Sequence, residues 1–221
     1  MVQPNLQTLA QKLKTGDAKD KKIALASLRD VPAASAVPLI KLVLDDPNLQ
    51  VRSMAIFALG VKPTEDCYPI LIKVLETDPD YGIRADAAGA LGYLEDERAF
   101  EPLVRAFYED TDWLVRFSAA VALGNLKDVR AHDALIQALN SKEVVIQQAA
   151  IAAFGEIGDL SAIDDILRFA QADDWLVRQR LAESLGNLPS DKSKSALRYL
   201  EKDGHPQVSE AARISLERLA A

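Results

Sequence analysis

The sequence has few of the residues on which disulfide bonds, metal sites and nucleophilic active sites depend. Its 221 residues include one cysteine, Cys67, and two histidines, His132 and His205. A single cysteine excludes an internal disulfide bond and suits a reducing compartment, and we interpret Cys67 as a small core residue. The histidines are far apart, and neither a Gly-rich phosphate loop nor a nucleophile elbow is present. We therefore expect no metal and no required cofactor.

Two kinds of segment are also missing. The formal net charge is −7 and no block of Lys and Arg occurs, so a nucleic-acid partner is not expected. No apolar run is long enough to span a bilayer. The first residues, 1–14, lack the apolar core of a secretory signal. These features predict a cytoplasmic protein that does not insert into membranes.

Aromatic residues are scarce, at 6 % against 49 % hydrophobic residues in all. Ala and Leu must therefore form most of the core, which is typical of closely packed helices. What the chain does contain is a repeat.

A ten-residue pattern, Val-Arg-x-x-Ala-x-x-Ala-Leu-Gly, recurs along the chain. It begins at Val51, Ile83 and Val115, returns more weakly at Ile146 and Val177, and is degraded near both ends. Its Arg position recurs every 31 or 32 residues, at 21, 52, 84, 116, 147, 178 and 209. Such a period is typical of stacked helical hairpins. The sequence predicts an all-α solenoid of about seven two-helix repeats, similar to HEAT repeats. They would form one domain over residues 1–221, curved as a right-handed superhelix.

Each repeat is expected to contain two helices. The second carries the pattern, whose apolar positions fall on one helical face. The first is the apolar stretch before it: 36–44, 68–75, 99–107, 131–139, 162–169 and 195–200. The pattern glycines are expected to end the second helices in the left-handed conformation; they are Gly60, Gly92, Gly124, Gly155 and Gly186. Three prolines, Pro38, Pro69 and Pro102, are expected to kink the first helices.

An acid stands about six residues before the Arg of several repeats. The pairs are Asp46 with Arg52, Asp78 with Arg84, Asp110 with Arg116, and Asp173, one place displaced, with Arg178. Both members are lost together at Ser141 and Gln147. We interpret this as an Asp–Arg ladder that ties each turn to the next helix; anion binding by the Arg residues is the alternative.

Two further sets of equivalent residues, one residue per repeat, precede the Arg position; we call each set a column. Tyr81, Trp113 and Trp175 lie three residues before it, away from the buried face. They either cap a helix against its neighbour or face a ligand or partner. The acids just before them, Asp80, Asp112 and Asp174, suit helix N-caps, and they are also available as acceptors at the rim of a groove.

The solvent side of the central second helices carries apolar or small residues, including Phe57, Phe117 and Val121. In stacks of this kind the second helices line the inner curve. We therefore expect a binding groove there, with packing of the curve against itself as the alternative.

Two matching segments, Asp112-Trp113-Leu114-Val115-Arg116 and Asp174-Trp175-Leu176-Val177-Arg178, open repeats that close on Ala-x-x-Ala-Leu-Gly or a near copy. With a whole chain built in this way, the sequence resembles the E/F-type phycobilin lyases of cyanobacteria. Its short single chain is most similar to the members that act in phycobilisome degradation, since the lyases often work as pairs of E and F chains.

The degraded end repeats look like polar caps and predict a monomer or weak dimer. The resemblance implies binding to phycobiliprotein subunits, phycocyanin and allophycocyanin, at phycobilisomes on the thylakoid surface. It implies an open-chain tetrapyrrole, phycocyanobilin, as ligand or substrate, and cleavage of its thioether bond to cysteine. Aromatic faces would stack on the bilin, Asp80 or Asp112 would accept from its pyrroles, and Arg84 or Arg116 would meet a propionate. Asp174 is a further ligand-binding candidate. Asp112 is the proton donor expected for detachment. The aromatic candidates are Tyr81, Trp113, Trp175, Phe57 and Phe117.

Two other functions remain open. The groove can grip a helix of a protein partner without any small molecule, as in a plain adaptor. The chain can also be a lyase subunit that attaches the chromophore.

Overall fold

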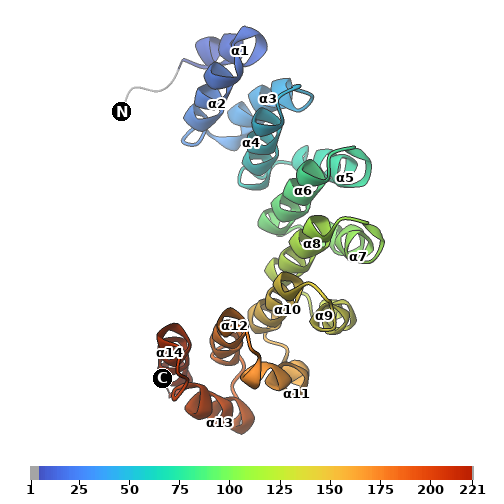
Figure 1. Ribbon diagram of the computed structural model, residues 1–221. Coiled ribbons are helices and arrows are strands. Elements are labelled where there is room, and N and C mark those ends of the chain that lie inside the picture. The colour runs from blue at the N-terminus through green and yellow to red at the C-terminus, as the bar shows by residue number, and fades with distance from the viewer. Residues whose placement is uncertain (1–4, 221) are drawn as a thin grey trace. The chain divides into compact units, whose positions relative to one another are not determined.

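The computed structural model describes residues 5–220, and all regular structure in that range is helical (Figure 1). The chain divides into two compact units, Met1–Pro102 and Leu103–Ala221. The first contains α1 (Leu6–Thr15), α2 (Ala18–Ser27), α3 (Ala33–Ile40), α4 (Leu49–Gly60), α5 (Cys67–Thr77) and α6 (Tyr81–Leu94). The boundary falls within α7 (Phe100–Glu109), and the second unit continues with α8 (Trp113–Asn125), α9 (His132–Leu139), α10 (Val144–Ile157), α11 (Ile163–Leu167), α12 (Trp175–Leu185), α13 (Asp191–Leu200) and α14 (Pro206–Ala220).

Short 3₁₀ segments adjoin several first helices. They are Lys41–Val43, Glu97–Ala99, Val129–Ala131, Leu160–Ala162 and Arg168–Gln171. The predicted all-α fold of two-helix repeats is confirmed, because the helices pair as first and second helices in the expected order. One domain over residues 1–221 and a right-handed curve stay predictions.

The repeat pattern is explained by burial within each unit. In unit 1, α4 packs on α2 and α6; in unit 2, α10 packs on α8 and α12, and α12 packs on α14. Pattern positions such as Val51, Val115 and Leu123 are fully buried. The helices α4, α10 and α12 therefore each lie between two other second helices, and a single hairpin would leave its apolar face exposed. Cys67 is buried at the start of α5, as expected of a small core residue.

The conformation expected of the pattern glycines is wrong. Gly60 is the last residue of α4, Gly124 and Gly155 lie within their helices, and Gly186 has a φ of −65°. Left-handed residues occur instead at Glu95, Lys127 and Gly158. The glycines serve close approach: a Cβ on Gly60 would lie 2.8 Å from the Cα of Ala90 on α6.

Two of the three prolines also act differently from expectation. Pro69 and Pro102 are the third residues of α5 and α7, so they lie in a first turn whose N–H groups have no partner within the helix. They need not kink these helices. Pro38 lies inside α3, which ends two residues later and passes into a 3₁₀ turn.

Candidate functional site

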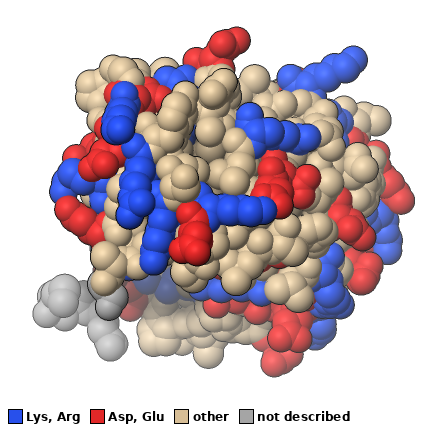
Figure 2. All heavy atoms as spheres, turned by 90° about the horizontal axis from the view of Figure 1, so that it is seen from below, with Lys and Arg blue, Asp and Glu red and all other residues tan. Residues whose placement is uncertain are grey.

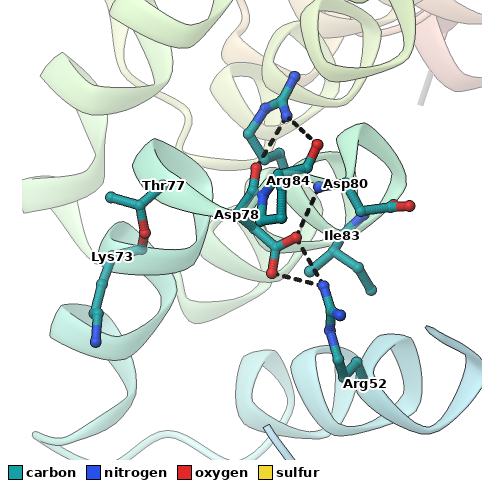
Figure 3. A network of polar contacts seen from close by, with 8 residues as sticks. Arg52, Lys73, Thr77, Asp78, Asp80, Ile83 and Arg84 are labelled. Atoms are coloured by element: carbon teal, nitrogen blue, oxygen red, sulfur yellow. Dashed lines mark hydrogen bonds and ion pairs between the residues drawn. The ribbon is translucent and has the colours of Figure 1, made fainter. Parts of the chain in front are cut away.

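The Arg that recurs in the repeat lies at the centre of a small network of polar contacts (Figure 3). We call each such network, made of one Lys or Arg and the acid it pairs with, a rung. In unit 1, Arg52 donates through Nη2 to both carboxylate oxygens of Asp78, at 2.7 and 2.8 Å. Asp78 also accepts the backbone N–H of Asp80 at 2.9 Å, and its carbonyl accepts from Arg84 at 3.0 Å. The rung thus joins α4, the turn before α6, and α6 itself.

In each rung, the acid belongs to the repeat that follows the one carrying the Lys or Arg. Lys21 pairs with Asp46 at 2.6 Å, and Arg178 pairs with Asp203 at 2.7 Å. The predicted series of acid–cation pairs exists, but the prediction that the acid and the Arg of one repeat form the ion pair is wrong. The Arg six residues after the acid instead donates to the backbone carbonyl of that acid. Gln147 keeps this carbonyl contact, to Ser141 at 2.7 Å.

Removing the acid of a rung should destabilise the protein at neutral pH. The hydrogen bond from Arg178 lowers the pKa of Asp203 below its usual value, although burial opposes this. Its stabilisation is therefore present above the unfolded pKa of about 3.9 and is lost as pH falls through the lower folded pKa. We expect Asp203→Asn to cost about 2 kcal/mol at pH 7, and less at pH 3.

Urea unfolding at the two pH values measures this difference. Asp164→Asn is the control, because Asp164 forms an exposed pair with Lys192, with side chains 71 % and 62 % accessible. Such a pair contributes about 0–1 kcal/mol. Equal losses in the two variants would contradict a stabilising role for the rung.

The acidic column forms helix N-caps. An oxygen of Asp80 accepts from the N–H of Ile83 at 3.1 Å, and one of Asp112 from Leu114 at 2.8 Å. Asp174 caps α12 through Leu176 at 2.7 Å. The capping role proposed for these residues is observed, and their roles toward a ligand, including proton donation by Asp112, stay predictions.

The aromatic column divides into two kinds of residue. Tyr81 and Trp113 are 52 % and 46 % exposed at the starts of α6 and α8. Trp175 stacks on His205, with ring centroids 4.1 Å apart and planes 11° apart. Trp175 thus contacts a neighbouring side chain, whereas Tyr81 and Trp113 offer ring surface to solvent; the ligand role of all three stays a prediction.

Unit 1 contains an apolar hollow of about 860 Å³. Its wall combines residues of α2, the turns after α2 and α4, the inner face of α4, and α6: Leu25, Ala26, Leu28, Arg29, Asp30, Ser53, Met54, Phe57, Ala58, Val61, Lys62 and Asp86. Phe57 is 54 % exposed there, and its ring is nearly perpendicular to that of Tyr93, with ring centroids 5.9 Å apart. Of the predicted site residues of unit 1, the hollow includes Phe57 but not Asp80, Tyr81 or Arg84.

Asp86 is a candidate residue that the sequence analysis did not identify. Burial raises the pKa of its carboxyl group and the charge of Asp80 adds to this, while the hydroxyl of Ser53 lowers it. A signal was present in the sequence, because the equivalent positions in the next three repeats hold Ser118, Ala149 and Arg180, and none is an acid. Asp86 is thus a partly buried acid beside an apolar surface, the environment in which carboxyl groups retain protons.

Neutralising Asp86 should stabilise the protein in a pH-dependent way. Because its pKa is raised in the fold, wild-type stability falls as pH rises from the unfolded value of about 3.9 through the folded one. We expect Asp86→Asn to melt at a higher temperature than wild type at pH 8, with the difference closing toward pH 4. Melting at both pH values checks this, with Asp30→Asn, an exposed acid of the same hollow, as control. An unchanged difference across pH would contradict it.

The surface formed by the second helices of unit 2 is more polar than the hollow of unit 1. A groove of about 740 Å³ runs over α10, α12 and α14, and its lining includes Gln179, Arg180, Glu183, Glu210 and Arg218. Phe117 is half-buried on α8 and Val121 is 36 % exposed, outside this groove. The expectation of an apolar inner face therefore fits the hollow of unit 1 better than this groove.

Lys and Arg side chains are interspersed with Asp and Glu on the face seen in Figure 2. Among residues 5–220, no helix has the length and apolarity needed to cross a membrane. In the same range no three His, Cys, Asp or Glu residues are grouped so that they could hold a metal ion.

The repeat pattern and its helical hairpins match a known family. The model of HEAT repeats matches residues 68–145 and 132–217. The chain is a HEAT-repeat protein. The match covers most of the chain, including the repeats that carry Trp113 and Trp175.

Solved structures share this HEAT-repeat architecture. The complex of CpcE and CpcF of phycocyanin lyase from Nostoc sp. PCC7120 is 19 % identical, with 99 % of this chain and 96 % of that chain covered and a TM-score of 0.63. YibA of E. coli is 18 % identical over 97 % and 93 % of the two chains, with a TM-score of 0.60. Kap95p, in a complex with RanGDP, is 16 % identical over all of this chain and 36 % of its own, with a TM-score of 0.61. At these identities the likeness shows the fold. No curated protein matches the chain.

Proposed function

We propose that this HEAT-repeat protein binds phycobiliproteins and detaches their open-chain tetrapyrrole, phycocyanobilin, as phycobilisomes are dismantled. The hollow of unit 1 carries the proposal, because it joins an exposed aromatic ring to a partly buried acid. The motif resemblance of the Asp-Trp-Leu-Val-Arg segments to E/F-type lyases supports it, and the phycocyanin lyase complex has the same fold.

The size and polarity of the hollow suit a flat ligand of this kind. Its volume of about 860 Å³ lies in the range of roughly 300–1,000 Å³ that small-molecule sites occupy. Phe57, Met54 and Val61 offer apolar surface for the pyrrole faces, and Asp86 offers a carboxyl group for the pyrrole N–H groups. At the same wall, Arg29 offers a guanidinium for a propionate, and Lys62 adds positive charge while its ammonium donates to the carbonyls of Arg29 and Val31.

Detachment needs a proton donor beside an apolar surface. In the proposed step the carbon–sulfur bond of the thioether breaks, and the sulfur leaves as a cysteine thiol with a proton from Asp86. The adjacent carbon of the bilin then loses a proton to the carboxylate, and a carbon–carbon double bond forms. Asp86 ends the step protonated again, so no oxidant or reductant is required.

Asp112 remains the alternative proton donor. It caps α8 in unit 2, beside the exposed Trp113. Asp86 and Asp112 belong to different units. If Asp86 is the donor, its replacement should slow bilin release, and if Asp112 is the donor, its replacement should do so.

Binding of free phycocyanobilin, followed by visible absorption, tests the hollow. We expect Phe57→Ala to weaken binding about tenfold, because a buried aromatic contact contributes roughly 1.5 kcal/mol. Leu49→Ala is the matched control, since Leu49 lies on the same helix and is 47 % exposed but does not line the hollow. Equal affinities of the Phe57 and Leu49 variants would contradict the assignment.

Release of bilin from chromophorylated phycocyanin separates the two donors. Asp86→Asn is expected to bind bilin but release it slowly, whereas Asp112→Asn is expected to release it at the wild-type rate. The reverse result would place the chemistry in unit 2. If bilin binding and release also survive Trp113→Ala with Asp112→Ala, the predicted unit 2 site is wrong.

The polar groove of unit 2 favours a second function, that of an adaptor. Its mixed charges, from Arg180, Glu183 and Glu210 among others, suit a protein helix rather than a flat apolar ligand. In that case the chain would form complexes with phycocyanin or allophycocyanin whose spectra are unchanged. Attachment of the chromophore, the third possibility, would instead transfer bilin to an apoprotein subunit.

A further inference from the structure

Two repeats of unit 2 share the same Asp-Trp-Leu-Val-Arg segment but differ in what satisfies it. At α12, Arg178 donates through Nη1 to the carbonyls of Ala172 and Asp173, at 2.6 and 3.1 Å. Its Nε and Nη2 bind the two carboxylate oxygens of Asp203, at 2.7 and 3.1 Å. The ring of Trp175 is covered by His205. Both groups are therefore occupied by the chain itself.

At α8 the same side chains lack these partners. Arg116 donates through Nη1 to the carbonyls of Asp110 and Thr111, at 3.0 and 3.1 Å, as Arg178 does to its own turn. In the described part of the chain, no carboxylate pairs with its Nε and Nη2. Trp113 is 46 % exposed.

The replacement of two residues explains the difference. Ser141 takes the place of Asp203: its Oγ accepts the N–H of Glu143 at 3.1 Å, as Asp203 accepts that of His205 at 2.8 Å. Glu143 takes the place of His205 and is exposed. One repeat therefore loses both the carboxylate for Arg116 and the ring that would cover Trp113.

We propose that Trp113 and Arg116 form a binding site for a carboxylate carried on a flat or apolar group. The ligand's carboxylate would take the place that Asp203 holds beside Arg178, and its apolar part would cover the indole as His205 covers Trp175. An Arg fork suits a carboxylate, which it binds through two parallel hydrogen bonds. Trp and Arg are also the residues that contribute most at binding surfaces.

The charges around the site are mixed. Lys142 is exposed next to Ser141 and favours an anion, whereas Glu143 and Asp112 oppose it. Removing Glu143 should therefore tighten binding. The proposed tetrapyrrole carries propionates, so it is one ligand of this class. The two sites are independent: this site can bind a carboxylate when the hollow of unit 1 binds no bilin, and the hollow can bind bilin when this site binds nothing.

Titration of the ¹⁵N-labelled full chain with 3-phenylpropionate tests the site. We expect the Arg116 Nε–H and Trp113 indole resonances to shift saturably, while those of Arg178 and Trp175 do not move. Acetate, which lacks the ring, should bind at least about tenfold more weakly, because the ring contact contributes roughly 1.5 kcal/mol. The neutral 3-phenylpropionamide should not saturate the site.

Ser141→Asp is the decisive variant, because it supplies the missing carboxylate from the chain and keeps the turn bond to Glu143. It is expected to abolish the shifts while the protein stays folded, and Glu143→Gln is expected to strengthen them. Arg116→Lys, which keeps the charge but not the fork, should weaken binding about tenfold or more. Shifts that persist in Ser141→Asp, equal shifts with the amide, or no saturable shift in wild type would each overturn the proposal.

Discussion

Replacing Gly60 with alanine is expected to lower the free energy of unfolding by about 3 kcal/mol, near the upper end of the usual cost of overpacking. A Cβ at this position would lie 2.8 Å from the Cα and 2.9 Å from the carbonyl oxygen of Ala90. Both are backbone atoms of α6, so no side chain can rotate to relieve the clash. The two helices would have to separate, and the contacts between their buried Ala and Leu residues would weaken.

Gly89 provides the control for this prediction. It lies in the middle of α6, and a Cβ there would have nothing within 4 Å. Gly89→Ala should therefore raise stability by about 0.5–1 kcal/mol through helix propensity alone. Urea unfolding of both variants measures the two effects. A Gly60 variant that behaves like the Gly89 variant would show that the close approach of α4 and α6 is not required.

Replacing Phe154 with alanine is expected to cost about 3–5 kcal/mol. Phe154 on α10 is fully buried, at a pattern position where other repeats have Leu. Its ring lies against that of His132 on α9 in an edge-type arrangement, with ring centroids 5.8 Å apart, so its removal leaves a cavity between the two helices of one repeat. By the scaling of melting temperature for chains of this size, Tm should fall by roughly 6–20 °C.

Phe57→Ala is the counterpart of this variant on the exposed inner face. It should change Tm little, because its ring is already more than half accessible, while it weakens bilin binding. Thermal melts with circular dichroism compare the two directly. A small effect of Phe154→Ala would mean that α9 and α10 are not held by this contact, and a large effect of Phe57→Ala would make it a structural residue.

The fold was predictable because the copies of the repeat can be compared with one another within one sequence. Each copy shows which positions every hairpin must bury, so Val51, Ala55 and Leu59 were correctly placed on the buried face. The role of Gly60 was misjudged for a physical reason: an approach between helices and a left-handed helix end both favour glycine. Only the position of α6 distinguishes the two.

The polar contacts were less predictable. An acid six residues before Arg52 suggests a local pair, yet Arg52 reaches Asp78 of the following repeat. Spacing along the chain does not reveal which turn a long side chain crosses. Asp203 is hard to predict because it lies in a degraded repeat. Asp86 does differ from the equivalent residues of the next three repeats, but only the hollow around it shows why that difference matters.

The most direct test of the proposed function is to mix the purified protein with chromophorylated phycocyanin and follow the visible absorption and the mass of the phycocyanin subunit. We predict that the visible band bleaches or shifts and that the subunit loses the mass of its bilin. This loss should be slowed by Asp86→Asn and should be unaffected by Leu49→Ala. A stable complex with an unchanged spectrum and an unchanged subunit mass would contradict detachment and leave an adaptor.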